Sequence, residues 1–302
     1  MATCANAHPY APYAQRATIP QVSPPTNVSS VPQRSVFRYP GGKTWLIPQI
    51  RTWLATQSAP PKLLIEPFAG GGITSLTAVA ENLVERALLI ELDPNVAAVW
   101  QVLVYGDAEG LARKIEKFQF SETNVRTELG KSPRSDLGRA FQTILRNRVQ
   151  RGGIMAKRAG LMKTGERARG LGSRWYPETL AKRIRDITTY RDRLDFITGD
   201  GLAVMSAHTS EKTTALFVDP PYSASTAGAG SRLYAASQLD HARLFQLAKA
   251  HQGPLLATYD NVPEVRALAA GYDLNVREIS MKSTHNAEMK ELLIGRNLSW
   301  AP

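Results

Sequence analysis

Short apolar runs without polar alternation recur along this chain, and glycine turns or helical patterns separate them. Such runs are typical of strands in a parallel sheet that helices cover on both faces. We expect strands at residues 62–67, 86–91, 195–200, 215–218, 254–258 and 291–294. Apolar positions at helical spacing predict helices at 45–54, 73–83 and 239–248, and another that opens at 93–95. A strand, glycine turn, helix and strand between residues 62 and 91 form a βαβ unit, so the sequence predicts an α/β fold.

Residues 105–190 interrupt this alternation. Helices are expected there at 111–118, 137–149 and 177–189, and the loop 151–173 is rich in glycine and arginine. We therefore divide the chain into a catalytic domain, residues 36–104 and 191–302, and a mostly helical insert, residues 105–190. Residues 1–35 contain six prolines and no acidic residue, and we expect a disordered tail.

Composition excludes several classes of protein. The 302 residues are 43% hydrophobic, which suffices for a core, and no apolar run of eighteen residues predicts a membrane span. The first 35 residues lack the order of a secretory signal. Cys4 is the single cysteine, so no disulfide or cysteine-based metal site is expected, and a cytoplasmic location is predicted.

Positive charge is concentrated in the insert. The chain has a net charge of +11, and residues 105–190 hold nineteen Lys and Arg against nine Asp and Glu, a net of +10. A solvated basic face is the ordinary explanation of scattered lysines, but a concentrated, arginine-rich excess favours binding to a nucleic acid. The candidate DNA contacts are Arg139, Arg146, Arg148, Arg151, Lys157, Arg158 and Arg174.

The predicted strand 215–218 ends in Asp219-Pro220-Pro221-Tyr222. Each proline removes a backbone donor and fixes φ, and the residue before a proline is held extended. The result is a stiff tip with a carboxylate, free carbonyls and an aromatic ring, which suits an amino-bearing planar ring. The alternative is a proline-rich turn with a structural role only.

Three further acids and a glycine turn lie at predicted strand ends. Phe68-Ala69-Gly70-Gly71-Gly72 has the composition of a nucleotide-binding turn, and Glu66 ends the strand before it. Glu91 follows Gly70 at the spacing at which an acid accepts from ribose hydroxyls, unless it is a surface acid. Asp200 could accept from an adenine amino group or only cap a turn. The candidate cofactor contacts in this region are Glu66, Phe68, Gly70, Gly72, Glu91 and Asp200.

Gly42-Lys43-Thr44 invites comparison with a phosphate-binding loop. Its spacing does not fit, because that motif requires glycine at position 37, where this chain has phenylalanine. Adjacent glycines and a lysine ahead of a helix instead suit a small carboxylate or phosphate.

Four motifs in order resemble the Dam-type (D12 class) DNA adenine-N6 methyltransferases. They are Tyr39-Pro40-Gly41-Gly42-Lys43, the run from Glu66 to Gly72, Ile90-Glu91-Leu92-Asp93-Pro94 and Asp219-Pro220-Pro221-Tyr222. Residues 256–261 and 290–294 also resemble later strands of that family, and residues 174–180 are similar to its phage and bacterial members. The likeness covers about residues 36–297 apart from the insert.

The resemblance implies a Rossmann-like, seven-stranded core that binds S-adenosylmethionine. It implies that Tyr39 and Lys43 touch the methionine end of the cofactor, that residues 68–72 lie beneath it and that Glu91 holds the ribose. Gly42 and Asp219 would also lie at the cofactor. The chain departs from the family in having Glu91 where Asp is usual and Tyr39 where Trp is frequent. The insert falls where the family places its target-recognition domain.

The expected reaction is methyl transfer to N6 of an adenine flipped out of double-stranded DNA. Asp219 and the Pro220 carbonyl would accept the amino hydrogens, and Tyr222 would stack on the base. No metal is implied, a monomer or weak dimer is expected, and a cognate restriction endonuclease is a further partner to consider. Cytosine-N4 methylation, an RNA substrate and a catalytically inactive DNA-binding relative stay as alternatives, and an ATP-using enzyme is opposed by the spacing at Gly42.

Overall fold

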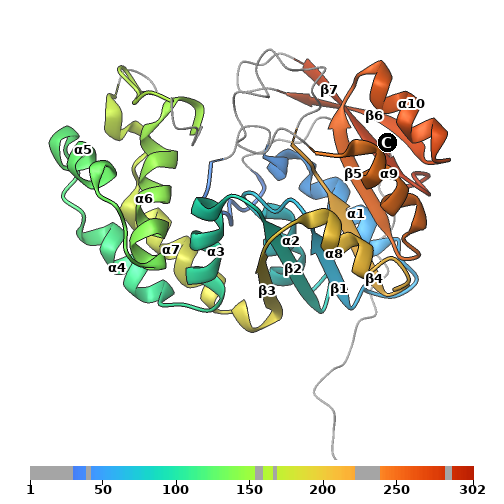
Figure 1. Cartoon of the computed structure of the whole chain (residues 1–302), viewed down its shortest axis with the longest axis horizontal. Coiled ribbons are helices and arrows are strands. Elements are labelled where there is room, and N and C mark those ends of the chain that lie inside the picture. The colour runs from blue at the N-terminus through green and yellow to red at the C-terminus, as the bar shows by residue number, and fades with distance from the viewer. Residues whose placement is uncertain (1–29, 39–41, 154–158, 166–168, 222–238, 283–287) are drawn as a thin grey trace, which may run out of the picture.

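The computed structural model describes residues 30–38, 42–153, 159–165, 169–221, 239–282 and 288–302. At its centre is a seven-stranded sheet with the strand order β3-β2-β1-β4-β5-β7-β6 (Figure 1). Its strands, in chain order, are β1 (Leu63–Glu66), β2 (Arg86–Glu91), β3 (Leu194–Thr198), β4 (Thr214–Val218), β5 (Leu255–Asp260), β6 (Asn275–Lys282) and β7 (Glu288–Gly295).

The sheet is parallel from β3 to β5, and β7 pairs antiparallel with both β5 and β6. The strand order reverses between β1 and β4, which are neighbours in the sheet but distant in the chain. In open α/β sheets, ligands bind at the carboxyl ends of the strands beside such a reversal. The fold therefore directs attention to the chain that leaves β1, β2 and β4.

Helices cover both faces of the sheet. Leu64 and Leu89 pack with α1 (Ile47–Ala55), α2 (Ile73–Ala80) and α3 (Pro94–Val104) on one face. Ile65 and Ile90, one residue further along their strands, pack with α8 (Gly201–Ala207), α9 (His241–Ala250) and α10 (Pro263–Gly271) on the other. Because successive strand residues face opposite sides, burial on both faces requires the continuous apolar runs seen in the sequence.

The insert is a group of helices beside α3. It contains α4 (Ala108–Lys117), α5 (Glu122–Gly130), α6 (Asp136–Val149) and α7 (Pro177–Thr188). Figure 1 shows these helices on one side of the molecule, with α3 between them and β3. Phe118 lies 5.3 Å from Phe141 and 5.7 Å from Trp175 between ring centroids, in edge-to-face contacts. This apolar cluster is continuous with the side chains of α3, so the insert shares a core with the sheet domain.

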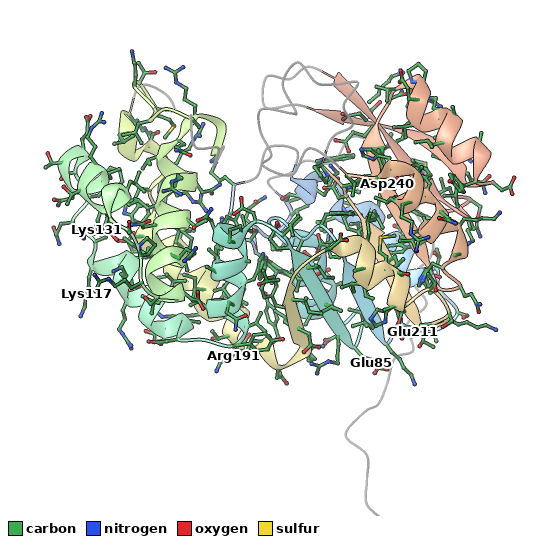
Figure 2. All side chains as sticks on the ribbon, viewed as in Figure 1. Glu85, Lys117, Lys131, Arg191, Glu211 and Asp240 are labelled. Carbon is green, nitrogen blue, oxygen red and sulfur yellow. The ribbon has the colours of Figure 1, made fainter. Side chains whose placement is uncertain are left out.

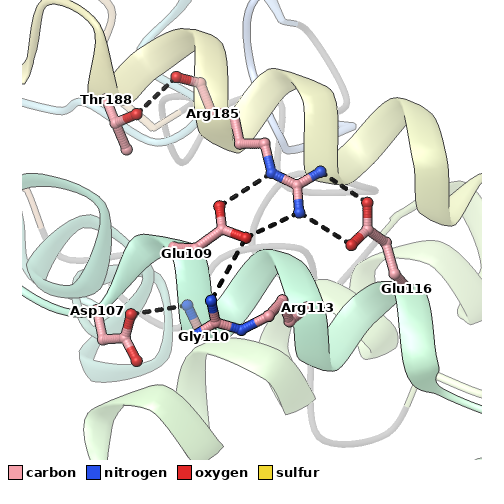
Figure 3. Close-up of polar contacts among 7 residues, drawn as sticks. All are labelled: Asp107, Glu109, Gly110, Arg113, Glu116, Arg185 and Thr188. Carbon is pink, nitrogen blue, oxygen red and sulfur yellow. Dashed lines mark hydrogen bonds and ion pairs between the residues drawn. The ribbon is translucent and has the colours of Figure 1, made fainter.

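Arg185 joins two helices of the insert through acidic partners. Its guanidinium donates to both oxygens of Glu109 and of Glu116, at 2.7–3.0 Å, and thereby links α7 to α4 (Figure 3). Arg113 also lies 3.7 Å from Glu109. Glu109 and Glu116 are thus paired with Arg185 and Arg113 rather than with the basic residues at 134–174.

The structure confirms the α/β fold and each of the six predicted strands, with small shifts at their ends. The short helices α5, α8 and α10 and the strand β6 were missed. β6 lies at the edge of the sheet and pairs with β7 only; Ile279 is buried, whereas Asn275, Arg277 and Glu278 are exposed, so the strand lacks an apolar run. Residue Val31 is 3% exposed and packs with Ile47 and Ile73, so the packed structure begins before the predicted boundary at residue 36.

Candidate active site

Asp219 follows β4 directly, at the carboxyl edge of the sheet. All five residues of β4 are buried, whereas the Asp219 side chain keeps 29% of its surface exposed. Thr258 of β5 donates its Oγ1 hydrogen to Oδ1 of Asp219 at 2.8 Å. Pro220 is buried and Pro221 partly buried, as expected for a rigid strand end, while Tyr222 lies outside the described residues.

Lys43 meets Asp219 from another part of the chain. It opens the short 3-10 helix η2 (Lys43–Leu46), and its Nζ lies 3.0 Å from Oδ1 of Asp219 and 3.3 Å from Oε2 of Glu291 on β7. Lys43 and Glu291 are each about 5% exposed. Burial raises the pKa of Glu291 to about 7, although the nearby Lys43 charge lowers it. Sequence reasoning placed Lys43 at the cofactor and missed Glu291, which it included only in a family-like strand.

The glycine turn lies between β1 and α2, at the same edge. Gly70 and Gly72 have φ values of 47° and 60°, which glycine adopts without strain. A Cβ at Gly72 would lie 2.5 Å from the ring of Trp100 and 2.7 Å from Leu89. Trp100, fully buried on α3, donates from Nε1 to the Gly70 carbonyl at 3.0 Å. The turn is therefore supported by a tryptophan that the sequence analysis did not single out.

Glu66 is buried beneath this turn. One carboxyl oxygen, Oε2, accepts from the backbone N–H of Ser75 at 3.1 Å and from its hydroxyl at 2.6 Å. Burial is the largest influence on Glu66 and raises its pKa to about 8, with a smaller contribution from the charge of Asp219. Glu66 therefore holds the first turn of α2, and its raised pKa favours the protonated form.

Glu91 binds backbone groups around the end of β2. Its Oε1 accepts from the N–H groups of Leu92 and Asp93 at 2.9 Å each, and its Oε2 accepts from Gly70 at 3.0 Å. Burial raises the pKa of Glu91 above its ordinary value, and the backbone donors oppose that rise. Each carboxylate oxygen can accept about two hydrogen bonds, so Oε2 keeps capacity for one more donor.

The remaining predicted cofactor residues are less enclosed. Asp200 is exposed and caps α8 by accepting from the N–H of Leu202 at 3.0 Å, which is the turn-capping alternative considered above. Phe68 is partly buried and Gly42 is exposed at the start of η2. Tyr39 lies outside the described residues.

Residues 31–38, which we call the entry segment, connect this site to the insert. Ser35 donates from Oγ to the Gly71 carbonyl of the glycine turn at 2.6 Å and accepts at its own carbonyl from Arg183 of α7 at 3.0 Å. Asn147 of α6 accepts from the N–H of Arg38 and donates to its carbonyl, at 2.9 and 2.8 Å. The entry segment is thus hydrogen-bonded both to the glycine turn and to two helices of the insert.

The position of Arg148 argues against its prediction as a direct DNA contact. It is 4% exposed and donates to the Val36 carbonyl of the entry segment. Burial above all, together with the neighbouring charges of Arg183, Arg38 and Arg174, lowers the pKa of Arg148 to about 9. A phosphate cannot reach a guanidinium enclosed in this way, so Arg148 connects elements of the protein instead.

The other basic candidates differ in exposure. Arg151 is exposed, whereas Arg139, Arg146 and Arg174 are partly buried, and Lys157 and Arg158 lie outside the described residues. Figure 2 labels Lys117 and Lys131 on the outer side of the insert. It also labels Glu85 and Glu211, which precede β2 and β4, at the lower edge of the sheet, so the candidate site occupies the upper edge.

The described part of the chain contains neither a metal-ligating cluster nor a membrane-spanning helix. Its His, Cys, Asp and Glu residues form no group of three or more that could hold a metal ion. Nor does the same part of the chain contain a helix long and apolar enough to cross a membrane.

Comparisons with known proteins identify a family. The model for the family described as D12 class N6 adenine-specific DNA methyltransferase matches residues 39–283. None of the curated proteins compared matches the chain. Among solved structures, the rRNA methyltransferase aviRa from Streptomyces viridochromogenes is 14% identical, with 92% of this chain and 96% of that chain covered and a TM-score of 0.40. Spermidine synthase from Thermotoga maritima is 10% identical, with 83% and 57% covered and a TM-score of 0.37.

Proposed function

This chain belongs to the D12 class N6 adenine-specific DNA methyltransferases, and from that membership we propose that it methylates the exocyclic N6 of adenine in DNA. The observation that carries the proposal is the Asp219 carboxylate. It stands at the carboxyl end of β4, beside the reversal of strand order, and its Oδ1 is held by Lys43 and Thr258. A partly exposed, fixed acceptor is what a planar amino group needs.

The glycine turn suits the nucleoside end of S-adenosylmethionine, the methyl donor of this family. Gly70 and Gly72 let the backbone approach a ligand closely, and Trp100 fixes the turn from within. Glu91 would accept from a ribose hydroxyl at Oε2, where capacity remains beside the Gly70 N–H. When bound, S-adenosylmethionine supplies a methyl group on positively charged sulfur, so that the N6–methyl bond forms as the sulfur–methyl bond breaks and its electron pair returns to sulfur.

Asp219 would activate the amino group by accepting its hydrogens. The N6 lone pair is delocalised into the adenine ring, so N6 is a weak nucleophile. Acceptors at Oδ2 of Asp219 and at the Pro220 carbonyl favour a nitrogen whose lone pair is freed for attack. After transfer, N6 carries one proton too many, which the Asp219 carboxylate would accept. Alignment of the two reactants supplies much of the remaining rate.

The insert would bind the DNA substrate. Adenine N6 is inaccessible to this chemistry inside a duplex, so the base must leave the stack, and Tyr222 would cover its face. Exposed basic side chains such as Arg151 would bind phosphates, while others could read guanine edges. Glu109, Glu116 and Asp186 pair with Arg185 and Lys182 of α7, so they offset little of the positive charge at residues 134–174.

The decisive experiment compares Asp219→Ala with the wild-type protein. We expect loss of methyl transfer by about 10²-fold or more, with DNA and S-adenosylmethionine affinities retained. Asp273→Asn is the matched control, because this carboxylate is 84% exposed and lies outside the site. Turnover of the wild-type order by Asp219→Ala would contradict the proposed role of the carboxylate.

Analysis of the methylated nucleosides tests the substrate. Digestion of DNA treated with the protein should release N6-methyladenine. N4-methylcytosine instead, or methylation of RNA in preference to DNA, would replace the proposal by one of the alternatives. Binding of S-adenosylmethionine and DNA without any methylated product would identify a catalytically inactive relative.

A further inference from the structure

Lys43 and Glu291 form a buried ion pair beside the carboxylate that the proposed reaction uses. Both side chains are about 5% exposed, and their charged atoms lie 3.3 Å apart. Burying an ion pair costs several kcal/mol per ion unless each charge is well compensated. Because an apolar pair of similar size would avoid that cost, the position of this pair at the active site is informative.

The two donors of Asp219 act on the same oxygen. Thr258 donates to Oδ1 at 2.8 Å, and Lys43 Nζ lies 3.0 Å from that same Oδ1. This arrangement fixes the carboxylate by one side and leaves Oδ2 to accept from an incoming amino group. The position of Lys43 therefore determines how Asp219 is oriented.

Glu291 reduces the effect of the positive charge of Lys43 on Asp219, because it pairs with the same ammonium. An ammonium that faces Asp219 alone would withdraw electron density from it and make it a poorer acceptor for amino hydrogens. When a second carboxylate shares that ammonium, less of its positive charge acts on Asp219, which remains the stronger hydrogen-bond acceptor. The other titratable groups that bear on the two carboxylates are Asp260 and Tyr259 of β5 and Glu66 of β1, all acidic.

We propose that Glu291 is a positioning residue for methyl transfer. It holds Lys43 in place and shares its charge, and so keeps the Asp219 carboxylate oriented with Oδ2 directed to the amino group. The inference rests on the proposed function, because it assigns Glu291 a part in the same reaction. Glu291 acts through Lys43 and touches neither reactant.

The proposal predicts a pH dependence of the chemical step. Burial raises the pKa of Glu291 to about 7. Below that pH Glu291 is neutral and no longer shares the charge of Lys43 with Asp219, so transfer is slow. Above it Glu291 is ionised and transfer is faster. The single-turnover rate of the wild-type protein should therefore rise through a pH near 7.

The test is Glu291→Gln, assayed by single turnover with S-adenosylmethionine and adenine-containing duplex DNA. We expect a rate about 10-fold lower at pH 8.5, KM values within about 2-fold of the wild type, and loss of the rise near pH 7. Glu278→Gln is the control, because Glu278 lies on the neighbouring strand β6 and pairs with Lys290 and Arg266 away from the site. Glu291→Gln with the wild-type rate and pH profile would overturn the proposal.

A double-mutant cycle checks that Glu291 acts through Lys43. The double variant Lys43→Gln with Glu291→Gln should be no slower than Lys43→Gln alone, and losses that multiply would overturn the proposal. If Glu291→Gln does not fold, the wild-type pH profile decides, since a rate without a rise between pH 6 and 8 overturns it too. Absence of N6-methyladenine from the wild-type reaction would instead refute the proposed function, so the two failures are distinct.

Discussion

The indole Nε1 of Trp100 donates a hydrogen bond of 3.0 Å to the carbonyl oxygen of Gly70. The donor is fully buried on α3, and the acceptor belongs to the turn at the carboxyl edge of the sheet. Gly72, two residues further on, packs against the same indole ring. The conformation of the proposed cofactor turn is therefore set by the packing of a side chain that follows it in the chain.

Replacing Gly72 by alanine should destabilise the protein and impair binding of S-adenosylmethionine. The new Cβ would lie 2.5 Å from Trp100 and 2.7 Å from Leu89, at a φ of 60° that L-residues rarely adopt. Strain and overpacking together predict a loss of about 3 kcal/mol in the free energy of unfolding. Urea denaturation and cofactor titration measure the two effects. Gly130→Ala is the control, because a Cβ at Gly130 meets no atom within 4 Å. Equal stability of the two variants would contradict this account.

Replacing Glu91 by glutamine should weaken binding of S-adenosylmethionine about 10-fold or more. The amide offers one acceptor oxygen in place of two, so it cannot serve Gly70, Leu92, Asp93 and a ribose hydroxyl together. Calorimetric titration of the cofactor measures the change. DNA binding by the insert should stay within 2-fold of the wild type, and an unchanged cofactor affinity would remove Glu91 from the proposed site.

Glu66 makes the stability of the protein depend on pH. Its folded pKa of about 8 lies above its ordinary value of 4.5. The folded state therefore holds a proton that the unfolded chain releases, and the resulting stabilisation is lost as pH rises from about 4.5 to 8. Glu66→Gln keeps an acceptor for Ser75 but cannot ionise. Relative to the wild type, we expect this variant to gain on the order of 3 kcal/mol at pH 9 compared with pH 4. Denaturation at both pH values checks this, and a constant difference between the proteins would refute it.

Arg148 and Arg151 should affect different properties although they are close in sequence. Arg148→Ala removes a buried donor from the Val36 carbonyl, so we expect a loss of about 2 kcal/mol in the free energy of unfolding. Arg151→Ala removes an exposed charge, so stability should hold while the salt dependence of DNA binding falls by about one unit of slope. Thermal unfolding and DNA titrations over a salt series separate the two. The reverse pattern would show that the basic surface has been misassigned.

Much of the sheet could be predicted from the sequence, because a strand that is buried on both faces is a continuous apolar run. The runs at β2 and β4 are apolar at nearly every position, and their boundaries follow from the acids that end them. β6 has no such apolar run, since an edge strand with one solvated face can be largely polar. The short helices α8 and α10 are likewise too brief for a helical period to be distinctive.

The residues of the candidate site also divide into those that a local sequence pattern predicts and those that it does not. Motifs identified Asp219, Glu91 and the glycine turn because each is contiguous and follows a strand. Their partners are not contiguous with them. Trp100 reaches the site from a helix, Ser35 from the entry segment and Glu291 from the last strand. No local sequence pattern predicts which neighbour each of them contacts.

The sequence by itself determined the strands, the glycine turn, the strand-end acids and the concentration of positive charge, because each depends on residues that are neighbours in the chain. The tertiary structure alone decided that Lys43 and Glu291 meet at Asp219, and that Arg148 is enclosed while Arg151 is not. These relationships depend on which strands pair and which helices pack together. Long-range packing also sets the burial of each charge, and burial determines whether an acid or a base serves the reaction, the nucleic acid or the fold.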